Sequence, residues 1–444
     1  MSDVHPLAAE ATGTTSDRRR TAADIAGLLA GRLADPDAIE HLFEQSVLME
    51  AGRPGLSLSV GFPAAALFHA ELAATRPAAR RTAHAMLARA ISQEPPSGGG
   101  ALYDGLTALA FAARNTAATA DDYRFLLSQL DPYVADLAHL RVERWSQRGP
   151  ATLTMSSYDV IQGLTGLGRY LLMAAPGGDA LREVLSFLVS ITDEPAEAAG
   201  HEVPGWWVTG PPWILAQHDP RYAHGHANLG LAHGISGPLA LLAIAWREGQ
   251  RVPGQRQAID SITDFLLRWR RPDEFGPRWP GVLTLDQLLG REEPGVVCNA
   301  TWCYGVPGIA RAIQLAGLAL DRADWLRVAD EAMRSLVDRP VDQLYLTAAG
   351  LCHGWAGLLQ IALRIAADST DEAASLVAGL AAERTIEHFD PALPYGFRYP
   401  ISADEPPTDG AGLLDGAGGT ALALHAYARG SAPASQWDAA LLIS

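Results

Sequence analysis

Residues 230–246 read GLAHGISGPLALLAIAW, and this stretch decides the fold. A glycine, two residues and a second glycine, Gly234 to Gly237, precede the apolar run. Counted from Ile235, apolar residues recur at i, i+4, i+7 and i+11, the spacing of one face of a helix. The pattern predicts an apolar helix that begins at the glycine pair.

The same pattern of glycine, two residues, and glycine or alanine recurs along the chain, each time before an apolar run. Seven copies start at Gly61, Gly105, Gly163, Gly234, Gly305, Gly354 and Gly416. Their starts lie 44 to 71 residues apart, which leaves room for two helices and a loop in each unit. Pro63, Pro238 and Pro307 stand near the starts of these runs, where a missing N–H costs little.

More polar, amphipathic segments lie between the repeats, for example residues 180–193, 255–270 and 323–337. Seven pairs of helices predict an all-α, double-layered α/α toroid, with about seven inner and seven outer helices. The alternative is an open helical solenoid. We favour the ring because the residues suited to chemistry cluster at the glycine pairs, and a closed ring would bring these loops to one end.

Two stretches, about 196–228 and 271–298, break the helical pattern, and the first predicts a small insertion with short strands. Residues 1–20 read as a disordered tail. The remainder, residues 21–444, is predicted to be a single toroid domain that carries the insertion.

The composition and net charge narrow the range of possible functions and cellular locations. The formal net charge of -16, with no basic stripe, argues against nucleic acid as a partner. Three cysteines in 444 residues fit a reducing compartment, and no signal peptide or bilayer-spanning run is evident. We therefore expect a cytoplasmic protein without a transmembrane segment.

Cys303, Cys352 and His353 are candidate metal ligands, because thiolates and imidazole are donors that zinc prefers. They flank the fifth and sixth glycine pairs, at equivalent repeat positions. Three protein ligands leave one coordination position open, as in catalytic zinc sites. Two thiolates cancel the charge of the ion, so a third thiol would bind as an electron-rich, nucleophilic thiolate near neutral pH.

His233 and Asp159 occupy corresponding places in neighbouring repeats and form a candidate acid–base pair. Tyr304 would assist protonation or line the cavity, and Cys298 is expected only to pack. Asp104 and Asp415 stand directly before repeat glycines and are expected to cap their helices.

Taken in order, the motifs at Tyr158–Gly166, Gly230–Gly237, Trp302–Gly308 and Cys352–Gly354 resemble those of the lanthionine synthetase C family. The resemblance covers about residues 55–425 and implies an α/α toroid with zinc held by Cys303, Cys352 and His353. It also implies His233 and Asp159 as the acid–base pair. The family often has an arginine four residues before the first zinc cysteine. Asn299 stands there instead, so the group that stabilises an enolate stays open.

The resemblance implies a stand-alone lanthipeptide cyclase for antibiotic (lantibiotic) biosynthesis. It would add cysteine thiols of a dehydrated precursor peptide, leader plus core, to dehydroalanine or dehydrobutyrine and form (methyl)lanthionine thioether rings. A dehydratase and a transporter are expected as partners, with peripheral membrane association through such a complex. Alternatives are a relative that adds glutathione to dehydrated residues, a prenyltransferase-like barrel, and a non-catalytic zinc-bound scaffold for a dehydratase or transporter.

Overall fold

The structure of the protein, a computed structural model, describes residues 14–44, 54–92, 100–148, 153–212, 216–295, 299–400 and 408–444. The chain forms two compact units, each built from several segments. Unit 1 comprises Met1–Leu130, Ala300–Trp302 and Met333–Asp438, and unit 2 comprises Asp131–Asn299, Cys303–Ala332 and Ala439–Ser444. The single domain expected over residues 21–444 stays a prediction.

Seven helices begin at the seven glycine pairs, as predicted. They are α3 (Phe62–Ala73), α5 (Gly105–Thr116), α8 (Leu164–Ala174), α10 (Ser236–Arg247), α13 (Val306–Leu320), α15 (Trp355–Ala367) and α17 (Ala417–Arg429). They are buried on nearly every side; in α10 every residue from Ser236 to Ala245 is buried. A helix that is apolar all round belongs in the core. Proline occupies the first turn of α3 and of α13, where it removes no intrahelical hydrogen bond.

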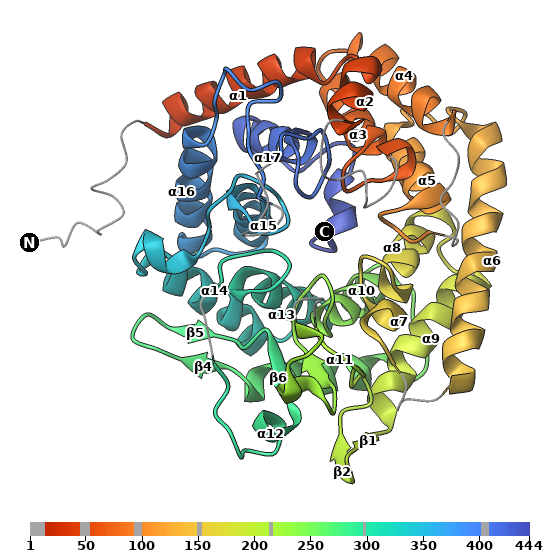
Figure 1. The fold of residues 1–444 in the computed structure, drawn as a ribbon, viewed down its shortest axis with the longest axis vertical. Helices are drawn as coiled ribbons and strands as arrows, with labels where there is room; N and C mark the ends of the chain where they lie inside the picture. Colours follow the sequence, from red (N-terminus) through yellow and green to blue (C-terminus); the bar gives the residue numbers. More distant parts are fainter. Residues whose placement is uncertain are drawn as a thin grey trace, which may run out of the picture. The chain divides into compact units, whose positions relative to one another are not determined.

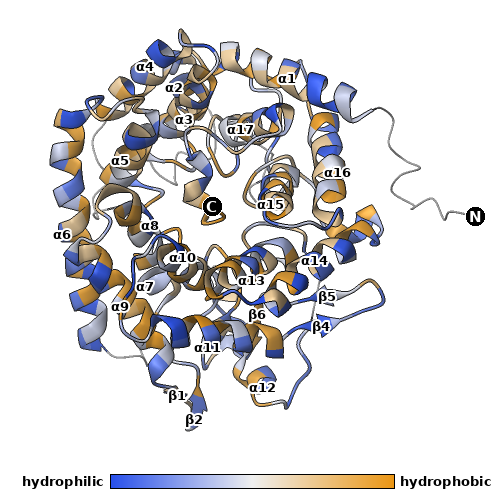
Figure 2. Ribbon diagram, turned by 180° about the vertical axis from the view of Figure 1, so that it is seen from behind, coloured by the Kyte–Doolittle hydropathy of each residue, from blue (hydrophilic) through white to orange (hydrophobic). Residues whose placement is uncertain are grey.

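A second set of more polar helices, most of them longer, accompanies the first set. These are α1 (Thr15–Arg32), α4 (Ala79–Ile91), α6 (Arg124–Arg148), α9 (Asp179–Asp193), α11 (Gln255–Arg268), α14 (Ala323–Val337) and α16 (Ala373–Glu387). The helices α9, α11 and α14 coincide with the predicted amphipathic segments. Figure 2 shows hydrophilic and hydrophobic residues alternating along helices of this set, such as α16. The remaining α-helices of the described residues are α2 (Pro36–Glu44) and the one-turn α7 (Met155–Tyr158) and α12 (Leu285–Leu288).

Within unit 1 the buried helices pack in the succession α15, α17, α3 and α5 (Figure 1). The polar helices cover them, with α16 on α15, α1 on α17 and α4 on α3. The last repeat helix, α17, therefore contacts the first, α3. An open solenoid keeps its terminal repeats apart, so this contact excludes the open arrangement.

Within unit 2 the helices α8, α10 and α13 pack in succession, with α9 on α8 and α11 on α10. Three two-stranded antiparallel sheets join them. They pair β1 (Ala196–Ala198) with β2 (His201–Val203), β3 (His226–Asn228) with β6 (Val282–Thr284), and β4 (Arg271–Pro272) with β5 (Pro277–Arg278). The strands predicted near 196–228 are confirmed. They are not a closed insertion, because β3 pairs with a strand from the second irregular stretch.

The N-terminal boundary differs from the prediction. Helix α1 begins at Thr15, and Thr14 and Asp17 form a capping box in which each side chain accepts from the backbone of the other. The expected disorder up to residue 20 is therefore wrong for residues 14–20, because this box closes the first turn. Residues 1–13 lie outside the described part of the chain. Among the described helices, none has both the length and the hydropathy to span a bilayer.

Candidate metal centre and acid–base site

Backbone hydrogen bonds hold the loops before the buried helices of unit 2 against one another. The Val160 N–H donates to the Ala232 carbonyl at 2.9 Å. The Leu231 and Ala232 N–H groups both donate to the Cys303 carbonyl, at 3.0 and 3.3 Å. Each acceptor lies two residues before its repeat glycine. The third, fourth and fifth repeats are thereby aligned, and the side chains of corresponding positions become neighbours.

His233 and Asp159 meet as a result. The imidazole Nδ1 lies 2.6 Å from Asp159 Oδ2, and the other carboxylate oxygen accepts from the Gln162 N–H at 2.7 Å. The Asp159 side chain is only 2% exposed, whereas that of His233 is 34% exposed. A buried carboxylate therefore fixes the ring through Nδ1 and leaves Nε2 to exchange a proton.

The electrostatic surroundings favour the protonated form of His233. Burial is the largest effect and by itself lowers the pKa of the imidazole. The hydrogen bond and the charge of Asp159, together with the charge of Cys303, outweigh it and raise the pKa above 6.5. A raised pKa suits a general acid that must still carry its proton near neutral pH.

Tyr304 lies beside this pair. Its ring stacks on the His233 ring with centroids 6.2 Å apart, and its hydroxyl accepts from Asn228 Nδ2 at 2.8 Å. A Cβ at Gly230 would lie 2.6 Å from the Cys303 carbonyl oxygen and 2.8 Å from the Tyr304 ring. Only glycine therefore permits this approach of the fourth repeat to the fifth.

The three predicted metal ligands lie together. The ligand atoms of Cys303, Cys352 and His353 are all within 4.8 Å of one another. Bond lengths of about 2.3 Å to sulfur and 2.0–2.1 Å to nitrogen place ligand atoms roughly 3.5–3.8 Å apart around a tetrahedral zinc. Two thiols and an imidazole are also the donor set that zinc prefers. The residues thus form a potential metal-binding site whose donor types fit zinc.

In unit 1, Cys352 and His353 are held in the same way as the loops of unit 2. The Leu351 and Cys352 N–H groups donate to the Leu414 carbonyl at 2.7 and 3.0 Å. This bond pair repeats the one that Leu231 and Ala232 make to Cys303. The local fold is therefore set by the repeat, and the side chain at each repeat position sets the chemistry.

The expectation that Asp104 and Asp415 cap their helices is wrong. Asp104 is the N-cap of α5, but its side chain makes no capping hydrogen bond and interacts with Ser57 instead. Burial raises the pKa of Asp104, and the bond to Ser57 opposes that rise. The N-cap of α17 is Gly416, and the neighbouring Asp415 has its Oδ1 3.9 Å from His353 Nε2.

Two further residues, Arg141 and Asn228, support the acid–base pair, although no motif in the sequence pointed to them. Arg141, on α6, donates to the carbonyl of Gln162, which is the residue whose N–H donates to Asp159. Burial lowers the pKa of Arg141, and the charge of Asp159 raises it. Asn228, at the end of β3, places Tyr304 and also accepts from the Gly230 N–H at 3.1 Å. Both contacts depend on packing between segments far apart in the chain.

The Asn299 carbonyl accepts from the Val306 N–H at 3.0 Å, at the start of α13. Cys298, expected only to pack, lies outside the described residues.

Comparisons with known proteins agree with this architecture. The nisin biosynthesis protein NisC of Lactococcus lactis subsp. lactis is 26% identical over 267 residues, which are 59% of this chain and 61% of that protein. The solved structure of nisin cyclase matches with a TM-score of 0.73 at 23% identity, over 91% of this chain and 96% of its own. This match confirms the predicted α/α toroid fold class. Residues 54–442 match the family described as lanthionine synthetase C-like protein, and the chain belongs to this family.

Proposed function

We propose that the protein is a zinc-dependent lanthipeptide cyclase. It adds cysteine thiols of a dehydrated precursor peptide to dehydroalanine or dehydrobutyrine residues of the same peptide. The observation that carries the proposal is the group formed by Cys303, Cys352 and His353, whose ligand atoms lie within 4.8 Å of one another. Membership of the family and the likeness to the nisin biosynthesis protein support the same activity.

The chain's own residues account for the proton that the reaction needs. The peptide thiol gives up its proton to solvent, and its sulfur forms a bond to the β-carbon of the dehydrated residue while the π electron pair of the double bond moves onto the carbonyl as an enolate. The enolate then takes a proton at its α-carbon. His233, protonated and held through Nδ1 by Asp159, has Nε2 available to donate that proton.

A zinc ion in the Cys–Cys–His group would supply a Lewis acid that lowers the pKa of the incoming thiol. Tyr304 stacks on His233 and is proposed to steady the ring or to assist the protonation. Enclosing both reacting ends of one peptide replaces a diffusional encounter by orientation, which contributes much of the rate.

The decisive experiment incubates the purified protein with a dehydrated, cysteine-containing peptide, with and without glutathione. Cyclisation is an isomerisation, so the mass stays constant while the peptide loses its reactivity toward a thiol-alkylating reagent. Addition of glutathione instead raises the mass by that of glutathione and leaves the peptide thiols free to alkylate. A protein that carries no zinc, or that leaves every thiol alkylatable, is not a cyclase.

The cellular setting follows from the proposed activity. The substrate is a leader-plus-core peptide already acted on by a dehydratase, so a dehydratase must precede this enzyme. Direct contact with the dehydratase or with a transporter, a cytoplasmic location, and peripheral membrane association through such a complex all stay predictions. Copurification of a tagged dehydratase with the cyclase tests the first of these.

A further inference from the structure

Asp415 occupies the repeat position that His233, Tyr304 and His353 occupy in other repeats, directly before the first glycine. In unit 1 its loop is bound to the loop of Cys352 and His353, because the Leu414 carbonyl accepts both from Leu351 and from Cys352. These two backbone hydrogen bonds hold the loops of the sixth and seventh repeats together, so the side chains of His353 and Asp415 are neighbours.

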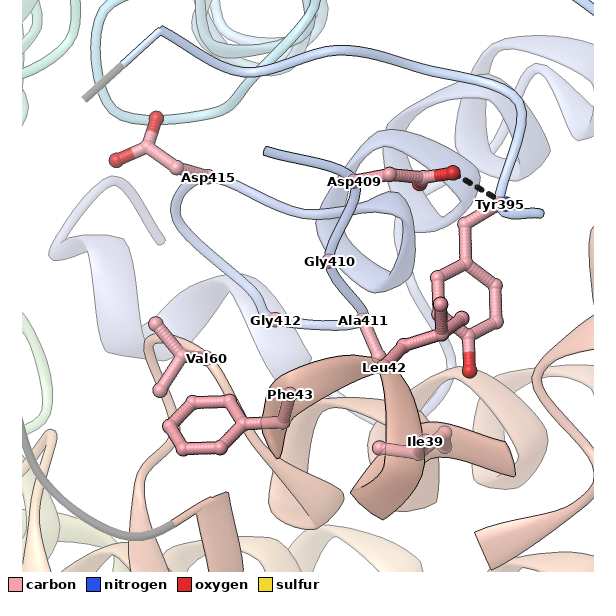
Figure 3. Close-up of a pocket in the computed structure, with 10 residues that line it drawn as sticks. All are labelled: Ile39, Leu42, Phe43, Val60, Tyr395, Asp409, Gly410, Ala411, Gly412 and Asp415. Atoms are coloured by element: carbon pink, nitrogen blue, oxygen red, sulfur yellow. Dashed lines mark hydrogen bonds between the residues drawn. The ribbon is translucent and has the colours of Figure 1, made fainter. Parts of the chain in front are cut away.

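Gly350 leaves the space into which the Asp415 carboxylate fits. A Cβ at position 350 would lie 2.8 Å from Asp415 Oδ1 and 3.0 Å from the Leu414 carbonyl oxygen. Asp415 Oδ1 in turn lies 3.9 Å from His353 Nε2, with the two side chains 36% and 43% exposed. Figure 3 shows the carboxylate of Asp415 turned away from the apolar side chains of Val60 and Phe43.

An imidazole that binds a metal through one ring nitrogen almost always donates the N–H of the other to a carboxylate, a carbonyl or water. Such a partner fixes the tautomer and the ring orientation, and it raises the basicity of the ligand. We propose that Asp415 is this positioning residue: it accepts the Nε2–H of His353, which makes Nδ1 the atom that binds zinc. The inference rests on the proposed zinc site.

The present separation of 3.9 Å is about 1 Å longer than an N–H···O hydrogen bond. The proposal therefore requires the two side chains to approach by about this distance when the metal binds. Asp409 lies on the same loop, but its carboxylate is turned to the other side and accepts from the Tyr395 N–H at 2.9 Å (Figure 3). It therefore provides a matched control for a change of charge in the loop.

The test measures the zinc affinity of the full-length protein by competition with a chromophoric chelator. Asp415→Ala is expected to weaken zinc binding about 10- to 100-fold, the range found for such outer partners. Asp415→Asn should lose less, because an amide oxygen still accepts from Nε2–H. Asp409→Asn should bind zinc as the wild type does. Circular dichroism shows whether each variant is folded, and Asp415→Asn remains informative where Asp415→Ala is not.

A second readout uses the cobalt(II)-substituted protein, whose thiolate charge-transfer bands report the cysteine ligands separately from the imidazole. Asp415→Ala should keep these bands and change the ligand-field bands. Wild-type zinc affinity in both Asp415 variants overturns the inference and leaves the proposed function standing. A wild type without zinc overturns the proposed function itself.

Discussion

His233 Nδ1 lies 2.6 Å from Asp159 Oδ2, although 74 residues separate the two in the chain. The carboxylate is buried and accepts a second hydrogen bond from the Gln162 N–H, so it is held in place. It therefore fixes the orientation of the His233 ring. This one contact determines which nitrogen of His233 can take part in proton transfer.

His233→Ala should leave zinc bound and slow cyclisation by about 10²- to 10⁴-fold, the usual contribution of a positioned general acid. The variant removes the proton donor without removing a metal ligand. Zinc content by metal analysis and the loss of alkylatable thiols with time check the two halves of the prediction. A variant that keeps the wild-type rate assigns proton transfer to another group.

The pH dependence of the reaction should report the raised pKa of His233. A general acid acts only while protonated, so the rate falls as the pH rises through that pKa. Asp159→Asn removes the hydrogen bond to a charged group and the charge that raise the pKa, and leaves the burial that lowers it. The alkaline limb of kcat/KM should therefore move to lower pH in Asp159→Asn. An unmoved limb means that another group sets it.

Cys303→Ala should lower the zinc affinity by more than about 100-fold, beyond the range for residues that only support a ligand. The control is Cys298→Ala, which changes the same residue type five positions earlier and should keep the metal. Zinc content after gel filtration in the presence of a chelator separates the two variants. Equal zinc in both would remove Cys303 from the metal site.

Gly230→Ala tests the packing that brings Cys303 and Tyr304 to the site. The new methyl group would lie 2.6 Å from the Cys303 carbonyl oxygen, so the loops must move apart. We expect a loss of about 1–3 kcal/mol in the free energy of unfolding, as for other overpacked positions. Gly295→Ala meets nothing within 4 Å and serves as the control. Denaturant unfolding of both variants gives the comparison.

Asp409 should make stability depend on pH. Burial raises its pKa from 3.8 to about 6, although the Tyr395 N–H and the charges of Arg32 and Arg398 oppose the rise. The folded state thus binds more protons than the unfolded state between about pH 4 and 6, and stability falls as the pH rises through this window. Asp409→Asn should be more stable than the wild type by about 1–3 kcal/mol at pH 7–8. The difference should vanish below pH 4 in thermal or denaturant melts; a constant difference would contradict the pKa.

The order of the helices could be predicted because each depends on residues close in the chain. The glycine pairs and the spacing of Ile235, Leu239 and Leu242 indicated where the buried helices begin and which side chains they bury. The repeat register also placed Cys303 and Cys352 at equivalent positions, two residues before a repeat glycine, and His353 beside the second of them, before any contact was known. The prediction that Asp104 and Asp415 cap their helices was wrong. The sequence of an aspartate before a glycine is the same whether its side chain bonds to its own helix or faces a neighbouring loop.

The sequence by itself determined the repeat, the two sets of helices and the residue types offered at each repeat position, since these follow from local periodicity and hydrogen bonding. Only the tertiary structure decided which side chains meet. Examples are the backbone hydrogen bonds from Leu351 and Cys352 to Leu414, the hydrogen bond from Asn228 to the Tyr304 hydroxyl, and the short distance between Asp415 and His353. These contacts join segments tens of residues apart, and their geometry is set by the packing of whole helices, which no local pattern encodes.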